Sequence, residues 1–297
     1  MPPTMSRMGD VLTGFHAAWE FESDSVLIRY ERGIRTPKLF QTLGERRVPL
    51  TALAGVTLTP GRRGTVVLRA EPRPGADPLM DAADGQLKEG CDPYRLVVPA
   101  ERATLAEYYA EELRERLTGS GPAERHLVAP PEPPLRFKAY DGKASFDGSA
   151  VRFRWSWTGA SSAKWKAGDQ SFPVAGLGGV EWRSPEIFEG HLRLLPREAA
   201  SAQGAADRSR PPQPDQDPAA VVFGLGYGPV HESLPFAAAV LAAVRAAGPS
   251  TPVPVPAPRR DPADIADRIR HLGELHQAGL VTDEEFSVKK AELLAEL

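Results

Sequence analysis

Residues 19–30 read Trp-Glu-Phe-Glu-Ser-Asp-Ser-Val-Leu-Ile-Arg-Tyr, and residues 144–155 read Ala-Ser-Phe-Asp-Gly-Ser-Ala-Val-Arg-Phe-Arg-Trp. Both stretches end with large apolar side chains at every second position, and more polar residues such as Arg29 and Arg154 stand between them. This alternation predicts a β-strand that buries one face. The acidic or glycine-containing residues in the middle of each stretch predict the turn of a hairpin.

The similarity between the two stretches continues along the chain in the same order. Residues 47–56 resemble residues 172–180 through a shared proline, a leucine and a Gly-Val pair. Each copy then has a predicted strand, a polar excursion (72–92 or 196–217) and another predicted strand, and both excursions end at Asp-Pro. Features that recur in the same order predict an internal duplication.

An amphipathic helix is predicted to close each copy. Residues 101–117 place apolar side chains such as Leu105 and Leu113 along one stripe of a helix. The corresponding helix of the second copy is predicted at 235–246, with Pro235 as its first residue. Several short strands followed by one helix indicate an α+β fold dominated by β-structure.

Proline clusters mark the seams between units, because proline cannot join the interior of a helix or sheet. The chain of 297 residues is long enough for two domains of ordinary size. The predicted organisation is a first module at 9–118, a linker at 119–134, a second module at 135–246 with a polar insertion at 196–217, a linker at 247–260 and a helical hairpin at 261–297.

The C-terminal segment carries the signals of two short helices joined by a tight turn. Asp261 and Pro262 suit the start of the first helix, and Gly279 suits its end. Thr282 and Glu285 form a capping box for the second helix. The apolar residues expected at the hairpin interface are Ile269, Leu272, Leu275, Phe286 and Leu293.

Two resemblances to known families rest on these segments. The stretch 9–21, together with Pro49-Leu50 and Gly55-Val56, resembles a bacterial family described as domain of unknown function 4429. This resemblance covers about residues 9–246 and implies two pleckstrin-homology-like barrels, each closed by a C-terminal helix, without implying an activity. Residues 279–286, Gly-Leu-Val-Thr-Asp-Glu-Glu-Phe, resemble the short C-terminal domain known as SHOCT.

The composition argues against several classes of protein. A formal net charge of −3 does not indicate a nucleic-acid binder. The single cysteine, Cys91, cannot form an intrachain disulfide and fits a reducing compartment. Residues 1–10 contain no apolar signal-peptide core, and no apolar run approaches the ~20 residues that cross a bilayer. We therefore expect a cytoplasmic protein.

No residue pattern predicts catalysis, a metal site or a cofactor. The six histidines include no pair at metal-ligand spacing: His16, His126, His191, His231, His271 and His276. The run 224–228, Gly-Leu-Gly-Tyr-Gly, is interpreted as a strand end, because no helix is expected directly after it and no βαβ unit surrounds it. We expect a non-enzymatic binding or scaffold protein without a cofactor, and an enzyme with an unrecognised site is an alternative.

The leading hypothesis is self-association, or docking to a protein partner, through 261–297. Peripheral binding to a membrane or anionic ligand is another alternative, although a solvated face of mixed charge is the simpler interpretation of the same basic residues. Trp165 stands between two lysines and is the better candidate for an exposed contact, whereas Trp155 and Trp157 are predicted to pack in the core. The candidate contact residues are Arg29, Lys38, Arg46, Arg47, Arg154, Lys164, Trp165 and Lys166.

Overall fold

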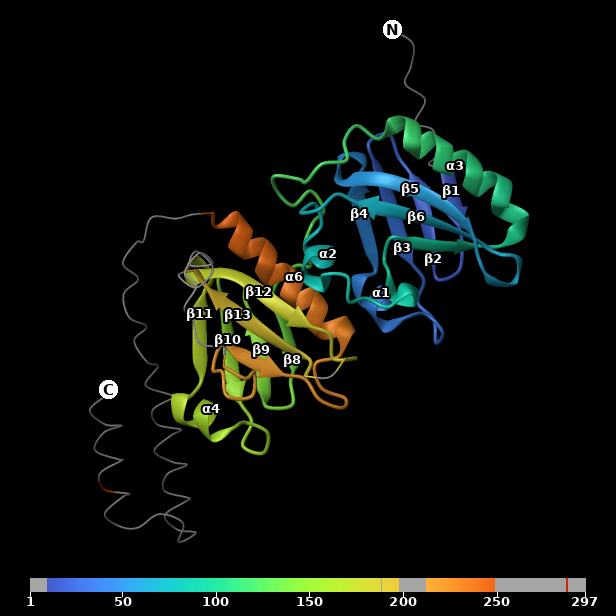
Figure 1. Ribbon diagram of the computed structural model, residues 1–297. Helices are drawn as coiled ribbons and strands as arrows, with labels where there is room; N and C mark the ends of the chain where they lie inside the picture. Colours follow the sequence, from blue (N-terminus) through green and yellow to red (C-terminus); the bar gives the residue numbers. More distant parts are fainter. Residues whose placement is uncertain (1–9, 188, 198–211, 249–286, 288–297) are drawn as a thin grey trace. The chain divides into compact units, whose positions relative to one another are not determined.

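A computed structural model of the chain describes residues 10–187, 189–197, 212–248 and 287 (Figure 1). Residues Met1–Pro249 form one compact unit, and Ser250–Leu297 form a second. The predicted hairpin falls outside the described residues apart from Ser287, which is helical and exposed. The five residues predicted at the hairpin interface all lie outside the described residues.

The first copy contains two antiparallel sheets. The first sheet has four strands in sequential order: β1 (Asp10–Thr13), β2 (Ala17–Phe21), β3 (Ser25–Tyr30) and β4 (Glu45–Pro49). The second sheet has three strands: β5 (Leu53–Pro60), β6 (Val66–Pro72) and β7 (Arg95–Val98). The α-helices of this copy are α1 (Lys38–Leu43), α2 (Pro78–Ala83) and α3 (Ala103–Arg116), and its short 3₁₀ turns are η1 (Leu50–Ala52), η2 (Arg62–Gly64), η3 (Glu89–Cys91) and η4 (Ala100–Arg102).

The second copy repeats this order. Its four-stranded sheet consists of β8 (Leu135–Lys138), β9 (Gly142–Phe146), β10 (Ala150–Trp155) and β11 (Gln170–Pro173). Its three-stranded sheet consists of β12 (Leu177–Arg183), β13 (His191–Pro196) and β14 (Ala220–Val222). In the described residues of this copy, the α-helices are α4 (Ser162–Ala167) and α6 (Val230–Ala246), and η5 (Val174–Gly176) is a 3₁₀ turn.

The strand registers of the two copies agree. Phe21 faces Val26 across the β2–β3 hairpin, and Phe146 faces Val151 across the β9–β10 hairpin. The β5–β6 and β12–β13 pairs both shift register between the first and third residues of their first strand. The prediction of an internal duplication is therefore confirmed at the level of individual residue pairs.

The repeated Asp-Pro dipeptides have the same structural role in both copies. The Asp92 carboxylate accepts the backbone N–H two residues further on at 2.9 Å and lies 3.2 Å from Nε of Arg69. The Asp217 carboxylate likewise accepts a backbone N–H two residues on at 2.9 Å and lies 3.0 Å from Nε of Arg193. Each aspartate therefore starts the last strand of its copy and ties it to the neighbouring strand.

The predicted α+β class, dominated by antiparallel β-structure, is confirmed. The predicted closure into barrels is not seen, because the described strands of each copy form separate hydrogen-bonded sheets of four and three strands. The two sheets of the first copy nevertheless enclose one core, in which Trp19 of β2 and Leu68 of β6 are fully buried.

The two closing helices depart from their predicted limits to different degrees. Helix α3 occupies most of 101–117, but Leu105, predicted on its apolar stripe, is 41% exposed. Helix α6 begins at Val230 after Pro229, so the prediction of Pro235 as its first residue is wrong. Pro235 instead lies inside the helix, where it cannot donate a backbone hydrogen bond to the carbonyl of residue 231, and the helix continues through it.

Helix α6 packs against elements of both copies. All residues from 233 to 240 are buried, so no face of this part of the helix meets solvent. The hydrophobic core of the second copy includes Leu39 of α1 and three residues of α2: Leu79, Ala82 and Ala83. Figure 1 shows α2 and α1 beside α6. A helix buried all round is apolar on every face, which explains the alanine-rich sequence of α6.

Candidate functional site

The structure contradicts the predicted exposure of two basic residues, Arg46 and Lys164. Arg46 of β4 donates two hydrogen bonds, of 2.9 and 2.7 Å, to the buried carboxylate of Asp77. Tyr94 donates a third hydrogen bond to the same carboxylate at 2.7 Å. Burial alone raises the pKa of Asp77, but the guanidinium and these hydrogen bonds outweigh burial and hold that pKa below its ordinary value.

Lys164 of α4 is completely buried in the second copy. Its Nζ donates to Oδ2 of Asp141 at 2.5 Å and to the backbone oxygen of Ala220 at 2.8 Å. The other oxygen of Asp141 accepts the backbone N–H of Val222 at 3.0 Å. Burial lowers the pKa of Lys164 and raises that of Asp141 in spite of their mutual attraction. This pair therefore ties β14 to α4 and offers no free charge at the surface.

Three other predicted arginines are more than half exposed but neutralised by carboxylates. These ion pairs are Arg29 with Glu20 and Glu45, Arg47 with Glu22, and Arg154 with Asp169. Lys38, Trp165 and Lys166 are exposed. On the strands, the predicted basic residues therefore carry little free positive charge, whereas Lys38 and Lys166, on short helices, form no ion pair with a residue that the structure describes.

Trp157 is 64% exposed, so its predicted place in the core is wrong. Strand β10 ends at Trp155, which is buried as predicted, and Trp157 lies in the turn that follows. The ring of Trp157 meets that of Trp165 at a centroid distance of 5.0 Å, with the rings nearly perpendicular. The period-two pattern therefore stops at Trp155.

The same end of each copy exposes apolar side chains. We call this the loop end: the β1–β2 turn and the β3–α1 loop in the first copy, and the β8–β9 turn and the β10–α4 loop in the second. Phe15 is 51% exposed in one turn, and Tyr140 is 53% exposed in the other. Their backbone N–H groups donate to equivalent acceptors, Val97 at 2.7 Å and Val222 at 3.0 Å. Sequence reasoning missed both residues, because isolated side chains in turns follow no period.

The glycine-rich run 224–228 also lies at the loop end of the second copy. Gly224 pairs with Tyr227, and the ring of Tyr227 lies 6.2 Å from that of Tyr140. Gly226 and Gly228 have φ of 79° and 63°, a conformation that favours glycine. A helix does follow this run, contrary to the prediction, but β14 pairs antiparallel with β13, so there is no βαβ unit to bind a dinucleotide here.

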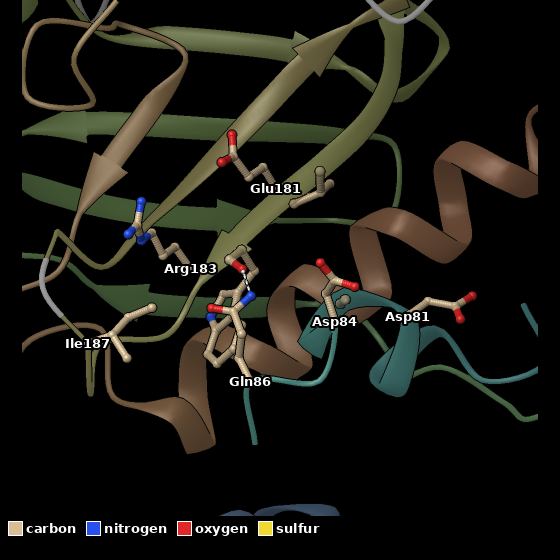
Figure 2. A pocket seen from close by; sticks show the side chains of 9 residues that line it. Asp81, Asp84, Gln86, Glu181, Arg183 and Ile187 are labelled. Carbon is tan, nitrogen blue, oxygen red and sulfur yellow. Dashed lines mark hydrogen bonds between the residues drawn. The ribbon is translucent and has the colours of Figure 1, made fainter. Parts of the chain in front are cut away.

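A cavity of about 480 Å³ lies between the two copies (Figure 2). Asp81, Asp84 and Gln86 line it from the first copy, and Glu181 and Arg183 line it from β12. The Gln86 amide joins the two copies beside this cavity. It donates to the backbone oxygen of residue 182 at 3.0 Å and accepts the N–H of residue 184 at 2.9 Å.

Two of the three carboxylates of this cavity are engaged by neighbouring side chains, and Asp81 also lies 3.7 Å from Arg245 of α6. Glu181 accepts a hydrogen bond from Arg193 at 3.2 Å and lies 3.7 Å from His191, and these neighbours lower its pKa. Asp81 accepts the backbone N–H of residue 75 at 3.1 Å and lies 3.2 Å from Nε2 of His126. Across the described part of the chain there is no group of three or more His, Cys, Asp or Glu residues that could hold a metal ion.

Among the described helices, none has the length and apolar character needed to span a bilayer.

Family models match the chain in three places. The model described as Domain of unknown function (DUF4429) matches residues 19–114 and again 144–241, and the model described as Short C-terminal domain, SHOCT, matches residues 267–294. No curated protein matches the chain. The two DUF4429 matches cover more than half of the sequence and coincide with the two structural copies. The chain therefore belongs to the DUF4429 family, with that domain in two copies and a C-terminal SHOCT domain.

Proposed function

We propose that this protein is a non-enzymatic binding and assembly protein. The observation that carries the proposal is the packing of α6, which joins the two DUF4429 copies through one shared core within residues 1–249. The SHOCT-matching segment belongs to a separate unit. A chain built in this way presents related surfaces twice and keeps a second element for association.

The use of buried ionisable groups supports a non-catalytic role. The buried residues Arg46 and Lys164 each form an ion pair with a carboxylate of their own copy. Such closed pairs perturb pKa values for structural reasons, whereas a catalytic group must also reach a substrate. The carboxylates of the cavity in Figure 2 are likewise engaged by neighbouring residues or lie at the seam between copies.

The order of elements supports a pleckstrin-homology-like module for each copy. Four sequential antiparallel strands, three further strands and a C-terminal helix occur twice in the same order. This likeness concerns the fold, and it brings no ligand with it. The alternative of membrane or anionic-ligand binding through the basic faces loses its strand residues, because Arg29, Arg46 and Arg47 are each paired with a carboxylate. Outside the strands, Lys38 and Lys166 remain exposed.

The proposal assigns self-association, or docking to a protein partner, to residues 261–297. The test measures the mass in solution of the full chain, of the chain ending at residue 249, and of full chains carrying Leu275→Asp or Phe286→Asp. We expect the full chain to form an oligomer and the three altered chains to be monomers, since a buried unpaired carboxylate opposes an apolar interface.

Ser287→Asp is the matched control, because it adds the same charge beside Phe286 at an exposed position. This control should keep the mass of the unaltered chain. A full chain that is monomeric and recovers no protein partner from cell extract, or an oligomer that Leu275→Asp and Phe286→Asp leave intact, would rule out the assembly role of this segment.

A further inference from the structure

The loop end of the first copy carries the most exposed apolar side chain of that copy, Ile34, at 106% relative exposure. The loop that holds it is ordered by hydrogen bonds. The N–H of Thr36 donates to the oxygen of Gly33 at 3.1 Å, and the Gln41 amide donates to the oxygens of Gly33 and Thr36 at 3.0 and 2.9 Å. Ile34 therefore projects from a formed turn.

Three cations lie within four residues of this isoleucine in the sequence: Arg32, Arg35 and Lys38. All three are exposed, and none forms an ion pair with any residue that the structure describes. The only carboxylate within the loop is that of Glu31, so the segment 31–38 has a net charge of +2 from three cations and one anion. This contrasts with Arg29 and Arg47 of the adjacent strands, which are neutralised by glutamates.

The loop end of the second copy has the same character but uses aromatic side chains. Trp157 and Trp165 are 64% and 48% exposed and contact one another. The loop of Trp157 is joined to the Tyr140 turn by a 2.9 Å hydrogen bond from the N–H of residue 156 to the oxygen of residue 141. Lys138 lies 5.0 Å from the ring centroid of Tyr227, and Lys166 is exposed beside Trp165. Asp169, the nearest acidic residue in sequence, is paired with Arg154.

An exposed group of large apolar side chains costs free energy in water and marks a surface that something covers. Free cations beside apolar side chains suit an anionic bilayer, because headgroups attract the cations while the apolar side chains enter the boundary of the acyl region. Tryptophan and tyrosine are the aromatic residues enriched at that boundary. We propose that the loop end of each copy is a contact surface for anionic lipid bilayers.

The test uses the full chain and sedimentation with phosphatidylcholine vesicles, with or without about 30 mol% phosphatidylglycerol, at about 20 and about 500 mM salt. The protein should bind only the anionic vesicles, and high salt should release most of it because mobile ions screen the cations. Neutralising Arg32 or Arg35 with glutamine should weaken the affinity about fivefold each at low salt.

Ile34→Asp and Trp157→Asp should each weaken binding roughly tenfold or more, since each removes an apolar side chain that would enter the bilayer and adds a charge that the anionic headgroups repel. Both residues are exposed, so these variants should keep the fold. Ser23→Asp is the matched control: it adds the same charge to an exposed residue of the β2–β3 turn, at the opposite end of the β2–β3 hairpin from the loop end. Arg125→Gln removes an exposed cation from the segment between the copies.

Absence of binding to anionic vesicles at low salt overturns the proposal. So does equal weakening by Ile34→Asp and Ser23→Asp, because the effect would then be one of net charge alone. Loss of self-association in Ile34→Asp or Trp157→Asp without any vesicle binding also overturns it, and assigns the loop end to a contact between copies of this chain. Anionic binding that is weakened by the two loop-end variants and kept by both controls supports it.

Discussion

The closing helices α3 and α6 hold the same position in two copies of one domain, yet they are buried differently. Helix α3 buries a single stripe: Ala106, Tyr109, Ala110 and Leu113. Helix α6 buries every residue from 233 to 240, because α1 and α2 of the first copy cover the side that its own sheets leave open. A duplicated domain is therefore not a pair of independent units here, since one copy completes the core of the other.

The buried charges of the two copies differ as well. The first copy uses Arg46, Asp77 and Tyr94, and the second uses Lys164 and Asp141 at other places in the fold. The Asp-Pro ion pairs, by contrast, recur at equivalent positions. The strand framework is thus shared, whereas each copy binds its excursions and helices to that framework with its own polar contacts.

The largest effect is expected from the buried pair of the first copy. Arg46→Met leaves the Asp77 carboxylate buried without its counter-charge and should lower the free energy of unfolding by about 3–5 kcal/mol. Arg47→Met, on the same strand, removes an exposed arginine paired with Glu22 and should cost about 1 kcal/mol or less. Urea unfolding of both variants measures the difference, and equal losses would show that burial of Arg46 is unimportant.

Lowering the pH should reduce the stability that the buried Asp77 carboxylate contributes through its pair with Arg46. The pKa of Asp77 is lower in the folded chain than in the unfolded chain, so its charge contributes stability above the ordinary aspartate pKa of about 4. This stability is lost as the pH falls through the lowered pKa. The unfolding free energies of the unaltered chain and of Asp77→Asn should therefore converge as the solution is acidified. A difference between them that stays constant with pH would contradict the assignment.

The shared core gives the next largest effect. Leu79 belongs to the first copy but is fully buried in the core of the second. Leu79→Ala should cost about 2–4 kcal/mol and should shift the unfolding of the second copy. Amide exchange in β12 and β13 follows that copy directly. If amide exchange in β12 and β13 is unchanged in Leu79→Ala, the two copies are not coupled through this core. Tyr108→Ala, at an exposed position of α3, is the control.

The recurring ion pairs should give the smallest effects and the finest comparison. The side chain of Arg193 is 10% exposed and that of Arg69 is 56% exposed. Asp217→Asn should therefore cost about 1–3 kcal/mol, and Asp92→Asn about 1 kcal/mol or less, because water screens the exposed pair. Asparagine can still accept the backbone N–H, so the difference isolates the charge. Equal costs, measured by thermal unfolding, would mean that burial does not set the strength of this pair.

The strands and their order could be predicted, because the period of a strand and the residues of a turn are local signals. The alternation along β4 even indicates that Arg46 points inward, because Arg46 shares a face of the strand with the buried Val48. Its partner Asp77 lies 31 residues away in a polar excursion, and no local pattern connects the two. The prediction of an exposed contact failed for that reason, and Lys164 failed in the same way, with Asp141 23 residues away.

Helix starts and loop contacts were harder to predict. Both Pro229 and Pro235 suit a first helical position, and only the packing of α6 shows that the helix begins after the earlier one. The exposed side chains of the loop end, such as Ile34 and Trp157, stand in turns without periodicity. Their grouping depends on which turns meet at one end of the sheets, and this is decided by long-range strand pairing.

The packing of α6 against both copies determines when each core can form during synthesis of the chain. Chains emerge from the ribosome with the N-terminus first and tend to fold domain by domain. The core of the first copy has all its residues once Val128 has emerged, while the core of the second copy waits for α6. Until residue 246 has emerged, Leu39 and Leu79 of the finished copy remain uncovered together with the strands that await α6. Nascent or prematurely terminated chains of intermediate length are therefore expected to be the ones that chaperones must hold.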